Sequence, residues 1–318
     1  MIVVVGPTAS GKSALALRLA EEFGGEIVSC DSVAVYREME IGTAKPALEE
    51  REMVPHHMID IAWPDEPVTA GDYSRQAREA LRGIAERGRL PIVAGGTGLY
   101  LRALIDGLFP APPQKAGRRE RLREIVARRG PAYLHRVLAR LDRAAAEGIH
   151  ANDVPKVIRA VEVSLAADEP LTEQWRKGRD RLTGYRILRL GLDPPRARLY
   201  ERINQRAAAM FDRGLVEETE RLIGRYGAEC RALGSLGYAE AAAVLRGEMT
   251  REQAVTKAQQ GHRNYAKRQM TWFRREREMH WLKGCGGDED VLAAARTLVG
   301  DHLRLMHSGL PRAAAEIE

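Results

Sequence analysis

A glycine-rich turn near the amino terminus limits the possible folds more than any other part of the sequence. Residues 2–5 are apolar and β-branched, so they predict a short strand buried on both faces of a parallel sheet. The next eight residues read Gly-x-x-x-x-Gly-Lys-Ser, and an alanine- and leucine-rich run with helical spacing follows them. A strand before this pattern and a helix after it are the context that indicates a phosphate-binding loop.

The loop contains the groups that a phosphate or diphosphate requires. Gly6 and Gly11 allow the backbone to turn so that successive N–H groups face inward. The following helix adds its positive end, Lys12 adds a mobile cation, and Ser13 adds a hydroxyl suited to Mg²⁺. The alternative is a strand-to-helix turn with an incidental lysine. The loop alone does not identify the phosphate compound or the group that is transferred.

Length and composition narrow the class of protein. The 318 residues are enough for about two domains, and no apolar run approaches the roughly 18 residues of a membrane span. The chain starts directly on the first core strand, which leaves no room for a signal peptide. Three widely spaced cysteines suggest neither a disulfide framework nor a zinc site. We therefore expect a cytoplasmic protein without a membrane partner, and we take it to be a monomer.

Positive charge is concentrated in the middle of the chain. Residues 110–189 contain 18 Lys and Arg against 10 Asp and Glu, whereas the remainder contains 32 basic and 34 acidic residues. A basic module on a near-neutral core is typical of a protein that binds a polyanion. A set of solvated, arginine-rich helices would give the same composition.

Polar residues follow two further predicted strands. Residues 26–30 read as a strand that ends at Asp31, and residues 90–94 read as a buried strand that ends at the glycine cluster 95–98, which includes Thr97. In open α/β sheets, ligands bind at the carboxyl ends of the strands, so Asp31 should project into the crevice of the phosphate loop as a base or a Mg²⁺ ligand. The alternative for Asp31 is a turn cap. The glycine cluster suggests close approach to a ligand, and a simple tight turn is the competing interpretation.

The order of these elements predicts the domain organisation. The character changes at the proline-rich residues 110–113, after which arginine-rich segments with helical spacing continue to about residue 184. A strand pattern then returns, and the last third reads mostly as helices. We predict an α/β fold with a P-loop NTPase-like parallel sheet flanked by helices, formed by residues 1–109 plus 185–318. Residues 110–184 would form a basic helical insertion domain.

Two smaller features have competing interpretations. The adjacent residues His56 and His57 have no third ligand at a suitable spacing, so we interpret them as hydrogen-bonded structural histidines rather than a metal site. Residues 261–275 contain five basic and three aromatic side chains with no acidic residue between them. This stretch predicts either phosphate contacts or an amphipathic helix that covers the sheet.

Several stretches together resemble one family, the tRNA dimethylallyltransferases. In the family's order, the matching stretches are residues 6–13, 29–36, 41–46, 56–60, 95–100, 152–153, 159–162, 202–210, 237–238 and 265–273. Each is weak alone, but together they are specific and they run from residue 1 to about residue 275. The sequence departs from the family's pattern at Ala34, Lys156, Ala239, His262 and Asn264, which puts details of RNA recognition in doubt.

The resemblance implies an activity. It implies transfer of a dimethylallyl group from dimethylallyl diphosphate to N6 of the adenosine just 3′ of a tRNA anticodon, with Mg²⁺ held partly by Ser13. It also implies that Asp31 is the base, that Thr97 orients the reactants, and that Lys12 and Arg206 stabilise the diphosphate. The implied diphosphate-binding residues are Gly6, Thr8, Ala9, Ser10, Gly11, Lys12 and Ser13. The implied tRNA-binding residues are Asp31, Ser32, Val33, Ala34, Thr97, Arg119, Lys156, Arg159, Gly234, Gly237 and Tyr238.

Three other functions are compatible with parts of the sequence. An isopentenyltransferase acting on free AMP, ADP or ATP would share the core but would not need the basic insertion. A P-loop small-molecule kinase would use the same loop, and it also gives no reason for the insertion. A non-enzymatic RNA-binding module would leave Lys12, Ser13 and Asp31 without a purpose.

Overall fold

The computed structural model describes residues 1–109, 117–167, 169–176 and 178–307. It contains two compact units, one formed by Met1–Leu104 with Thr183–Glu318 and the other by Ile105–Leu182. The chain leaves and re-enters the first unit within a few residues of positions 110 and 184, where the sequence changes character. The proline-rich residues 110–113 lie outside the described residues.

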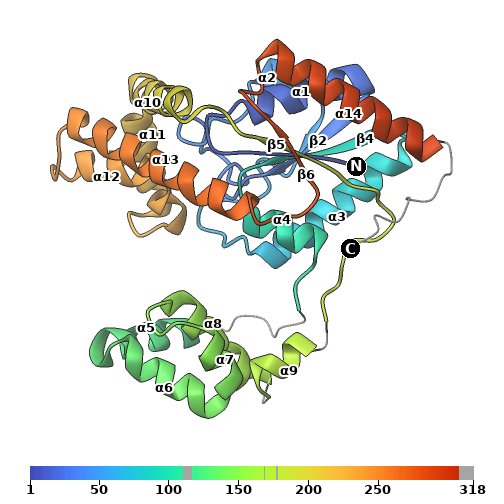
Figure 1. Cartoon of the computed structure of the whole chain (residues 1–318). Coiled ribbons are helices and arrows are strands. Elements are labelled where there is room, and N and C mark those ends of the chain that lie inside the picture. Colours follow the sequence, from blue (N-terminus) through green and yellow to red (C-terminus); the bar gives the residue numbers. More distant parts are fainter. Residues whose placement is uncertain (110–116, 168, 177, 308–318) are drawn as a thin grey trace. The chain divides into compact units, whose positions relative to one another are not determined.

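A parallel sheet forms the centre of the first unit (Figure 1), and this confirms the predicted fold class. Six strands lie in the described part of the chain, in the order β3-β2-β4-β1-β5-β6. Their bounds are β1 (Ile2–Val5), β2 (Gly25–Cys30), β3 (His56–His57), β4 (Leu90–Gly95), β5 (Leu188–Leu192) and β6 (Met279–Leu282). Val5 at the end of β1 lies opposite Gly95 of β4 and Gly191 of β5. The loops that carry the predicted site therefore all follow the carboxyl ends of neighbouring strands.

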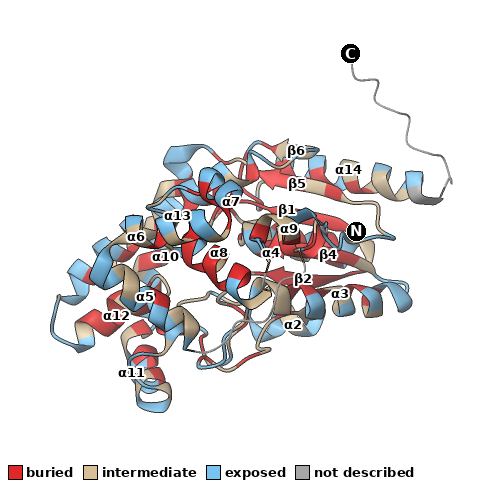
Figure 2. Ribbon diagram, turned by 90° about the horizontal axis from the view of Figure 1, so that it is seen from below, coloured by how far each residue is buried: buried red, intermediate tan, exposed pale blue. Residues whose placement is uncertain are grey.

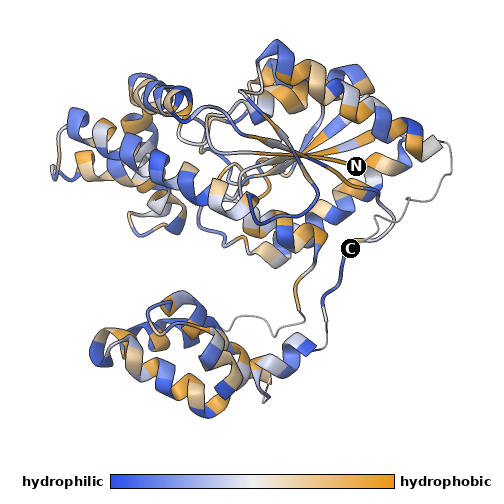
Figure 3. Cartoon of the chain, in the orientation of Figure 1, coloured by the Kyte–Doolittle hydropathy of each residue, from blue (hydrophilic) through white to orange (hydrophobic). Residues whose placement is uncertain are grey.

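Helices cover both faces of this sheet. On one face lie α1 (Lys12–Phe23) and α14 (Glu289–His307), whose apolar side chains share a core with β1, β4 and β5. On the other face lie α3 (Ala70–Glu86), which packs against β2 and β4, and α4 (Gly98–Ile105) (Figure 1). Hydrophobic residues are concentrated in the strands (Figure 3), and the strands are largely buried (Figure 2), as expected for a doubly covered parallel sheet. The short α2 (Leu48–Met53) lies between β2 and β3 in the sequence.

A second group of helices completes the first unit. It comprises α10 (Arg196–Asp212), α11 (Leu215–Tyr226), α12 (Tyr238–Leu245), α13 (Arg251–Phe273) and the short 3₁₀ helix η1 (Arg231–Gly234). Thr250 caps the start of the long helix α13, and its hydroxyl accepts a hydrogen bond from the amide of Gln253. It packs against α10 and α12. Among the described residues, none of the helices combines the length and apolar character that a membrane span needs.

Two strands had no clear signal in the sequence. β3 contains only His56 and His57, and neither residue belongs to an apolar run. His56 Nδ1 lies 2.7 Å from the carbonyl of Val54, and His57 Nε2 lies 2.7 Å from Oε2 of Glu26. The prediction that both histidines are structural and hydrogen-bonded is therefore confirmed. β6 reads Met-His-Trp-Leu at the opposite edge, where only Leu282 is fully buried.

Helices are the regular elements of the second unit in its described residues. Its helices are α5 (Arg118–Arg129), α6 (Pro131–Leu141), α7 (Arg143–Gly148), α8 (Val154–Ala167) and α9 (Leu171–Arg176). Gly130 and Asp142 divide the arginine-rich stretch into three helices, because Gly130 adopts a positive φ of 78° and Asp142 caps α7 through its carboxylate. Half of the residues of α8 are buried, and the helix packs against α5 and α6.

One buried carboxylate organises the basic residues of this unit. Glu162 on α8 has 4% of its side chain exposed, and it receives two hydrogen bonds from Arg119 at 3.1 and 2.7 Å. Arg159 lies 3.8 Å from the same carboxylate. A buried charge without a partner is costly, so Arg119 compensates Glu162 whatever else it contacts.

Removal of Arg119 should therefore destabilise α5 and α8. In Arg119→Ala the loss should be on the order of 3 kcal/mol, because Glu162 stays buried without its closest partner. Hydrogen–deuterium exchange of the full chain should show faster exchange of α8 amides by about a hundredfold. Arg128→Ala is the matched control, since Arg128 is exposed at the end of the same helix. Equal exchange rates in the two variants would contradict a structural role for Arg119.

Candidate active site

The phosphate loop lies between β1 and α1 and is held in shape by the protein itself. Gly11 adopts a φ of 87°, which a glycine tolerates without strain. The amide of Thr8 donates to Oε1 of Gln269 at 2.8 Å, and the amide of Ser10 donates to the carbonyl of Pro7 at 3.2 Å. In the described part of the chain, the amides of Ala9, Gly11, Lys12 and Ser13 have no hydrogen-bond partner. These N–H groups remain available for an anion at the positive end of α1.

A second loop closes the outer side of the phosphate loop. The amide of Gly286, four residues after β6, donates to the carbonyl of Ser10 at 2.8 Å. A Cβ added at Gly11 would lie 2.8 Å from the nitrogen of Gly286, so both glycines are needed for this approach. The edge strand β6 thereby helps to fix the loop that follows β1.

Two half-buried, poorly solvated cations and one carboxylate gather beside this loop. Burial, followed by the nearby charge of Arg206, lowers the pKa of Lys12 to about 8, whereas Asp31 opposes this shift. Burial also lowers the pKa of Arg206, and Asp31 again favours the charged form. Without an anion, the site holds two neighbouring positive charges that are poorly solvated. An anionic group bound between them would relieve that cost.

Asp31 follows β2 and uses its two carboxylate oxygens differently. Oδ1 accepts hydrogen bonds from the amides of Val33 at 2.9 Å and Ala34 at 3.3 Å, and these bonds fix the turn after the strand. Within the described residues, Oδ2 has no hydrogen-bond partner. The carboxylate is therefore a turn cap through one oxygen and is free to accept a proton through the other.

Thr97 lies at the end of β4, next to the turn that Asp31 caps. Its hydroxyl accepts a hydrogen bond from the amide of Ser32 at 3.1 Å. Tyr265 of α13 also interacts with Thr97, and burial raises the pKa of this tyrosine to about 12. Tyr265 therefore stays protonated at neutral pH and presents a hydroxyl beside Thr97 and Asp31.

The glycine cluster after β4 accommodates α13. A Cβ at Gly96 would lie 2.1 Å from Nε2 of Gln269, and a Cβ at Gly98 would lie 2.3 Å from the ring of Trp272. Nε2 of Gln269 donates to the carbonyl of Gly96 at 2.9 Å. Side chains of α13 therefore fill the space beside Gly96 and Gly98, and close approach of a ligand to this cluster stays a prediction.

Arg206 reaches the site from α10 with few hydrogen bonds to hold it. Its Nη2 donates to the carbonyl of Thr43 at 3.4 Å, and its buried Nε has no partner among the described residues. His262 of α13 lines a small cavity with Arg206, Thr8 and Ala9, and its buried Nε2 is also without a partner there. Burial, with a further contribution from Arg206, lowers the pKa of His262 to about 4, so this histidine is neutral at pH 7.

A larger cavity, of about 790 Å³, is lined by Ala266, Lys267 and Met270 of α13. It extends from Pro7 of the phosphate loop to the ends of β5 and β6, and its lining includes Arg196, Lys267, Arg274 and Lys283. Asp193 pairs with Lys283 at 2.5 Å and lies 3.6 Å from Arg274, so part of this positive charge is compensated.

The predicted tRNA-binding residues have different environments. Ser32, Val33 and Ala34 form the turn that follows Asp31, whereas Gly234 and Gly237 lie around the start of α12. Tyr238 is fully buried, so its side chain is not accessible at the surface for RNA.

The other three predicted contacts lie in the helical unit. Lys156 is exposed and pairs with Asp153, while Arg119 and Arg159 share Glu162. Their role in RNA binding stays a prediction.

The oxygen donors near the loop are of the kind that Mg²⁺ prefers. Ser13 is exposed in the first turn of α1, and the described residues include no group of three or more His, Cys, Asp or Glu side chains able to hold a metal. Mg²⁺ commonly takes one or two protein oxygens and completes its shell with substrate phosphates and water. One hydroxyl beside a phosphate loop fits that mode of binding.

Comparison with known proteins identifies the family. Residues 34–276 match the family model described as IPP transferase. A tRNA dimethylallyltransferase from Koribacter versatilis is 62% identical over 94% of this chain and 97% of its own length. A second, from Solibacter usitatus, is 52% identical over 95% and 99%.

The chain belongs to the IPP transferase family.

Solved structures of such transferases share the fold. The tRNA isopentenylpyrophosphate transferase of Bacillus halodurans is 35% identical, with a TM-score of 0.68 over 96% of this chain and 98% of its own. A eukaryotic dimethylallyltransferase that acts on tRNA is 25% identical, with a TM-score of 0.82 over 99% of this chain and 81% of its own. The predicted family and the predicted class of enzyme, a transferase, are both confirmed.

Three residues of this transferase site were not assigned by sequence reasoning. Tyr265 and Gln269 belong to the stretch 261–275, which was singled out for its cations and aromatic rings, and His262 was noted only as a departure from the family pattern. The stretch therefore carried the signal, but periodicity alone did not reveal which side chains face the loops. Their uncharged polar groups make the contacts with the predicted site.

The low pKa of Lys12 gives a pH test. Below about pH 8 the lysine is charged and attracts an anion; as the pH rises above that value, an increasing fraction is neutral, and part of the attraction is lost. The affinity for inorganic diphosphate should therefore fall above pH 8, by up to about tenfold per pH unit until it levels off. Titration calorimetry between pH 7 and 10 measures this fall.

Lys12→Met is the control for that measurement. It should bind more weakly at pH 7, and it should lack the part of the pH dependence that belongs to the lysine. An identical pH dependence in the two proteins would show that Lys12 does not contact the anion.

Proposed function

We propose that this protein transfers a dimethylallyl group from dimethylallyl diphosphate to N6 of the adenosine 3′-adjacent to the anticodon of tRNA and releases diphosphate. The observation that carries the proposal is the arrangement of Lys12 and Arg206 beside a phosphate loop that faces Asp31. The relatives named tRNA dimethylallyltransferase, which match almost the whole chain, support the choice of both substrates.

The chemistry follows from the charges. N6 of the adenosine attacks the allylic carbon, the bond from that carbon to the diphosphate oxygen breaks, and the amine loses a proton. Negative charge grows on the leaving diphosphate, where Lys12, Arg206 and the free loop amides stabilise it. Mg²⁺, when bound near Ser13, would neutralise further charge on the diphosphate. The allylic carbon shares positive character, so no covalent enzyme intermediate is required.

Asp31 is the proposed acceptor of the proton. Its Oδ2 has no hydrogen-bond partner among the described residues, while its Oδ1 is held by two backbone amides, so the carboxylate is fixed in orientation and still has a basic atom. Thr97 and Tyr265 add hydroxyl groups next to it, which can orient the amine or the diphosphate. The adenosine must leave its stack to reach this pocket, as the substrates of other base-modifying enzymes do.

The basic helical unit is the proposed holder of the anticodon stem-loop. It carries most of the excess positive charge of the chain, and phosphate contacts with shape recognition are the usual basis of RNA binding by such surfaces. Arg119, Lys156 and Arg159 are the proposed contacts there. The basic cavity lined by Pro7 is the proposed path for the diphosphate compound.

A labelling experiment tests the function directly. The protein is incubated with Mg²⁺ and radiolabelled dimethylallyl diphosphate, and bulk tRNA and AMP are offered in parallel. Label on tRNA alone is the expected result. Label on AMP would instead indicate an enzyme that acts on free nucleotides, and no label on either would contradict the proposal.

A single substitution tests the role of Asp31. Asp31→Asn keeps acceptor oxygen for the turn but removes the base, so turnover should fall by about 10²-fold or more. Binding of tRNA, measured by filter binding, should stay close to that of the unchanged protein. If turnover stayed within about tenfold, which is roughly 1.4 kcal/mol of barrier, Asp31 would not be the base.

A further inference from the structure

The segment 36–46 connects β2 to α2 and contacts Arg206, yet it has no place in the mechanism above. We propose that Tyr238 and Lys45 are positioning residues, which hold this segment so that the carbonyl of Thr43 orients Arg206 toward the diphosphate. The inference rests on the proposed role of Arg206. It also reverses the expectation for Tyr238, which the family resemblance had linked to tRNA.

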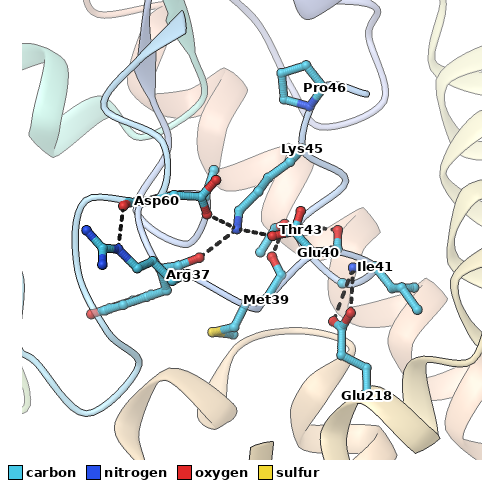
Figure 4. Close-up of polar contacts among 12 residues, drawn as sticks. Arg37, Met39, Glu40, Ile41, Thr43, Lys45, Pro46, Asp60 and Glu218 are labelled. Carbon is cyan, nitrogen blue, oxygen red and sulfur yellow. Dashed lines mark hydrogen bonds and ion pairs between the residues drawn. The ribbon is translucent and has the colours of Figure 1, made fainter. Parts of the chain in front are cut away.

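Lys45 anchors the segment from within (Figure 4). Its side chain is only 1% exposed, and its ammonium group donates to the carbonyl of Tyr36 at 2.6 Å, to Glu40 at 2.9 Å and to Asp60 at 2.5 Å. These three acceptors use all three donors of a lysine. The lysine thereby ties the two ends of the segment to each other and to the turn after β3.

Asp60 extends this anchor to neighbouring parts of the fold. Its second carboxylate oxygen receives a hydrogen bond from Arg51 of α2 at 2.8 Å, and its carbonyl receives one from Arg37 at 2.8 Å. Several independent contacts with Asp60 and α2 therefore fix the backbone path of residues 37–45.

Tyr238 and Glu218 anchor the same segment from the helical side. The hydroxyl of Tyr238 donates to Glu218 at 2.6 Å and accepts from the amide of Gly42 at 3.2 Å. The amide of Ile41 donates to both oxygens of Glu218 at 3.1 Å (Figure 4). Burial, and then the adjacent carboxylate of Glu218, raise the pKa of Tyr238 well above its usual value, so its hydroxyl keeps its proton.

The segment leaves little room for movement between these anchors. A Cβ added at Gly42 would lie 2.3 Å from Cε2 of Tyr238, so the backbone is packed directly on the tyrosine ring. The next residue, Thr43, is fixed by a hydrogen bond of 2.6 Å from its hydroxyl to the carbonyl of Met39. Its own carbonyl is the hydrogen-bond acceptor for Arg206 at 3.4 Å.

This contact matters because it is the one hydrogen bond that Arg206 makes to the described residues. The guanidinium group is otherwise held by burial and by attraction to Asp31. A planar cation binds diphosphate oxygens well only in a fixed orientation. Displacement of the Thr43 carbonyl should therefore weaken diphosphate binding without changing any group that touches the diphosphate or the RNA.

Tyr238→Phe tests this proposal, because it removes one hydroxyl and keeps the packed ring. The affinity for inorganic diphosphate, measured by titration calorimetry, should fall by about threefold to tenfold, as expected for the loss of one hydrogen bond. The KM for dimethylallyl diphosphate should rise in parallel. The affinity for tRNA should be unchanged, which distinguishes this role from direct RNA contact.

Tyr226→Phe is the matched control. Tyr226 lies on α11, and its hydroxyl donates to Glu38 of the same segment at 3.0 Å. Glu38 lies five positions before Thr43 and also pairs with Arg225. Diphosphate affinity should be unchanged in this variant. An equal loss in both variants would show a general effect on the segment and would overturn the proposal, as would weaker tRNA binding by Tyr238→Phe with unchanged diphosphate affinity.

A double-mutant cycle separates this inference from the role of Arg206 itself. Arg206→Gln should weaken diphosphate binding, and adding Tyr238→Phe to it should cause no further loss, because the tyrosine acts through the arginine. Full additivity of the two losses would overturn the positioning role. Unchanged diphosphate affinity in Arg206→Gln alone would instead refute the proposed role of Arg206.

Discussion

The side-chain amide of Gln269 joins the two loops on which the site depends. It accepts from the amide of Thr8 in the phosphate loop and donates to the carbonyl of Gly96 after β4. This one buried side chain of α13 thereby fixes the spacing between the carboxyl ends of β1 and β4. A shift of α13 would break both hydrogen bonds. The buried side-chain amide of Gln269 would then lack partners, which would lower the stability of the fold.

Much of the fold could be predicted because it depends on local patterns. Residues 2–5 and 90–94 form continuous apolar runs between glycine-rich turns, and only a doubly buried parallel strand suits such runs. β3 and β6 could not be predicted, since these edge strands are short and mostly polar or mixed, and only pairing with their neighbours makes them strands.

The site was predictable where backbone geometry determines it. The loop glycines, Lys12 and Asp31 occur at fixed positions after strands, and the structure brings Lys12, Asp31 and Arg206 into one electrostatic group. The contacts of Gln269, Tyr265 and Tyr238 depend instead on how distant helices pack. Gly96 illustrates the limit, because its sequence context is the same whether a ligand or a glutamine side chain occupies the space beside it.

The poorly solvated charges of Lys12 and Arg206 affect the stability of the protein when no substrate is bound. Each of these side chains loses solvation in the folded state, so the empty site reduces the stability of the very sheet edge that it is built on. Any anion that binds there returns this free energy to the folded state as ligand-linked stabilisation. In a cell, the level of free diphosphate compounds would then influence how much of the protein is lost to unfolding and proteolysis.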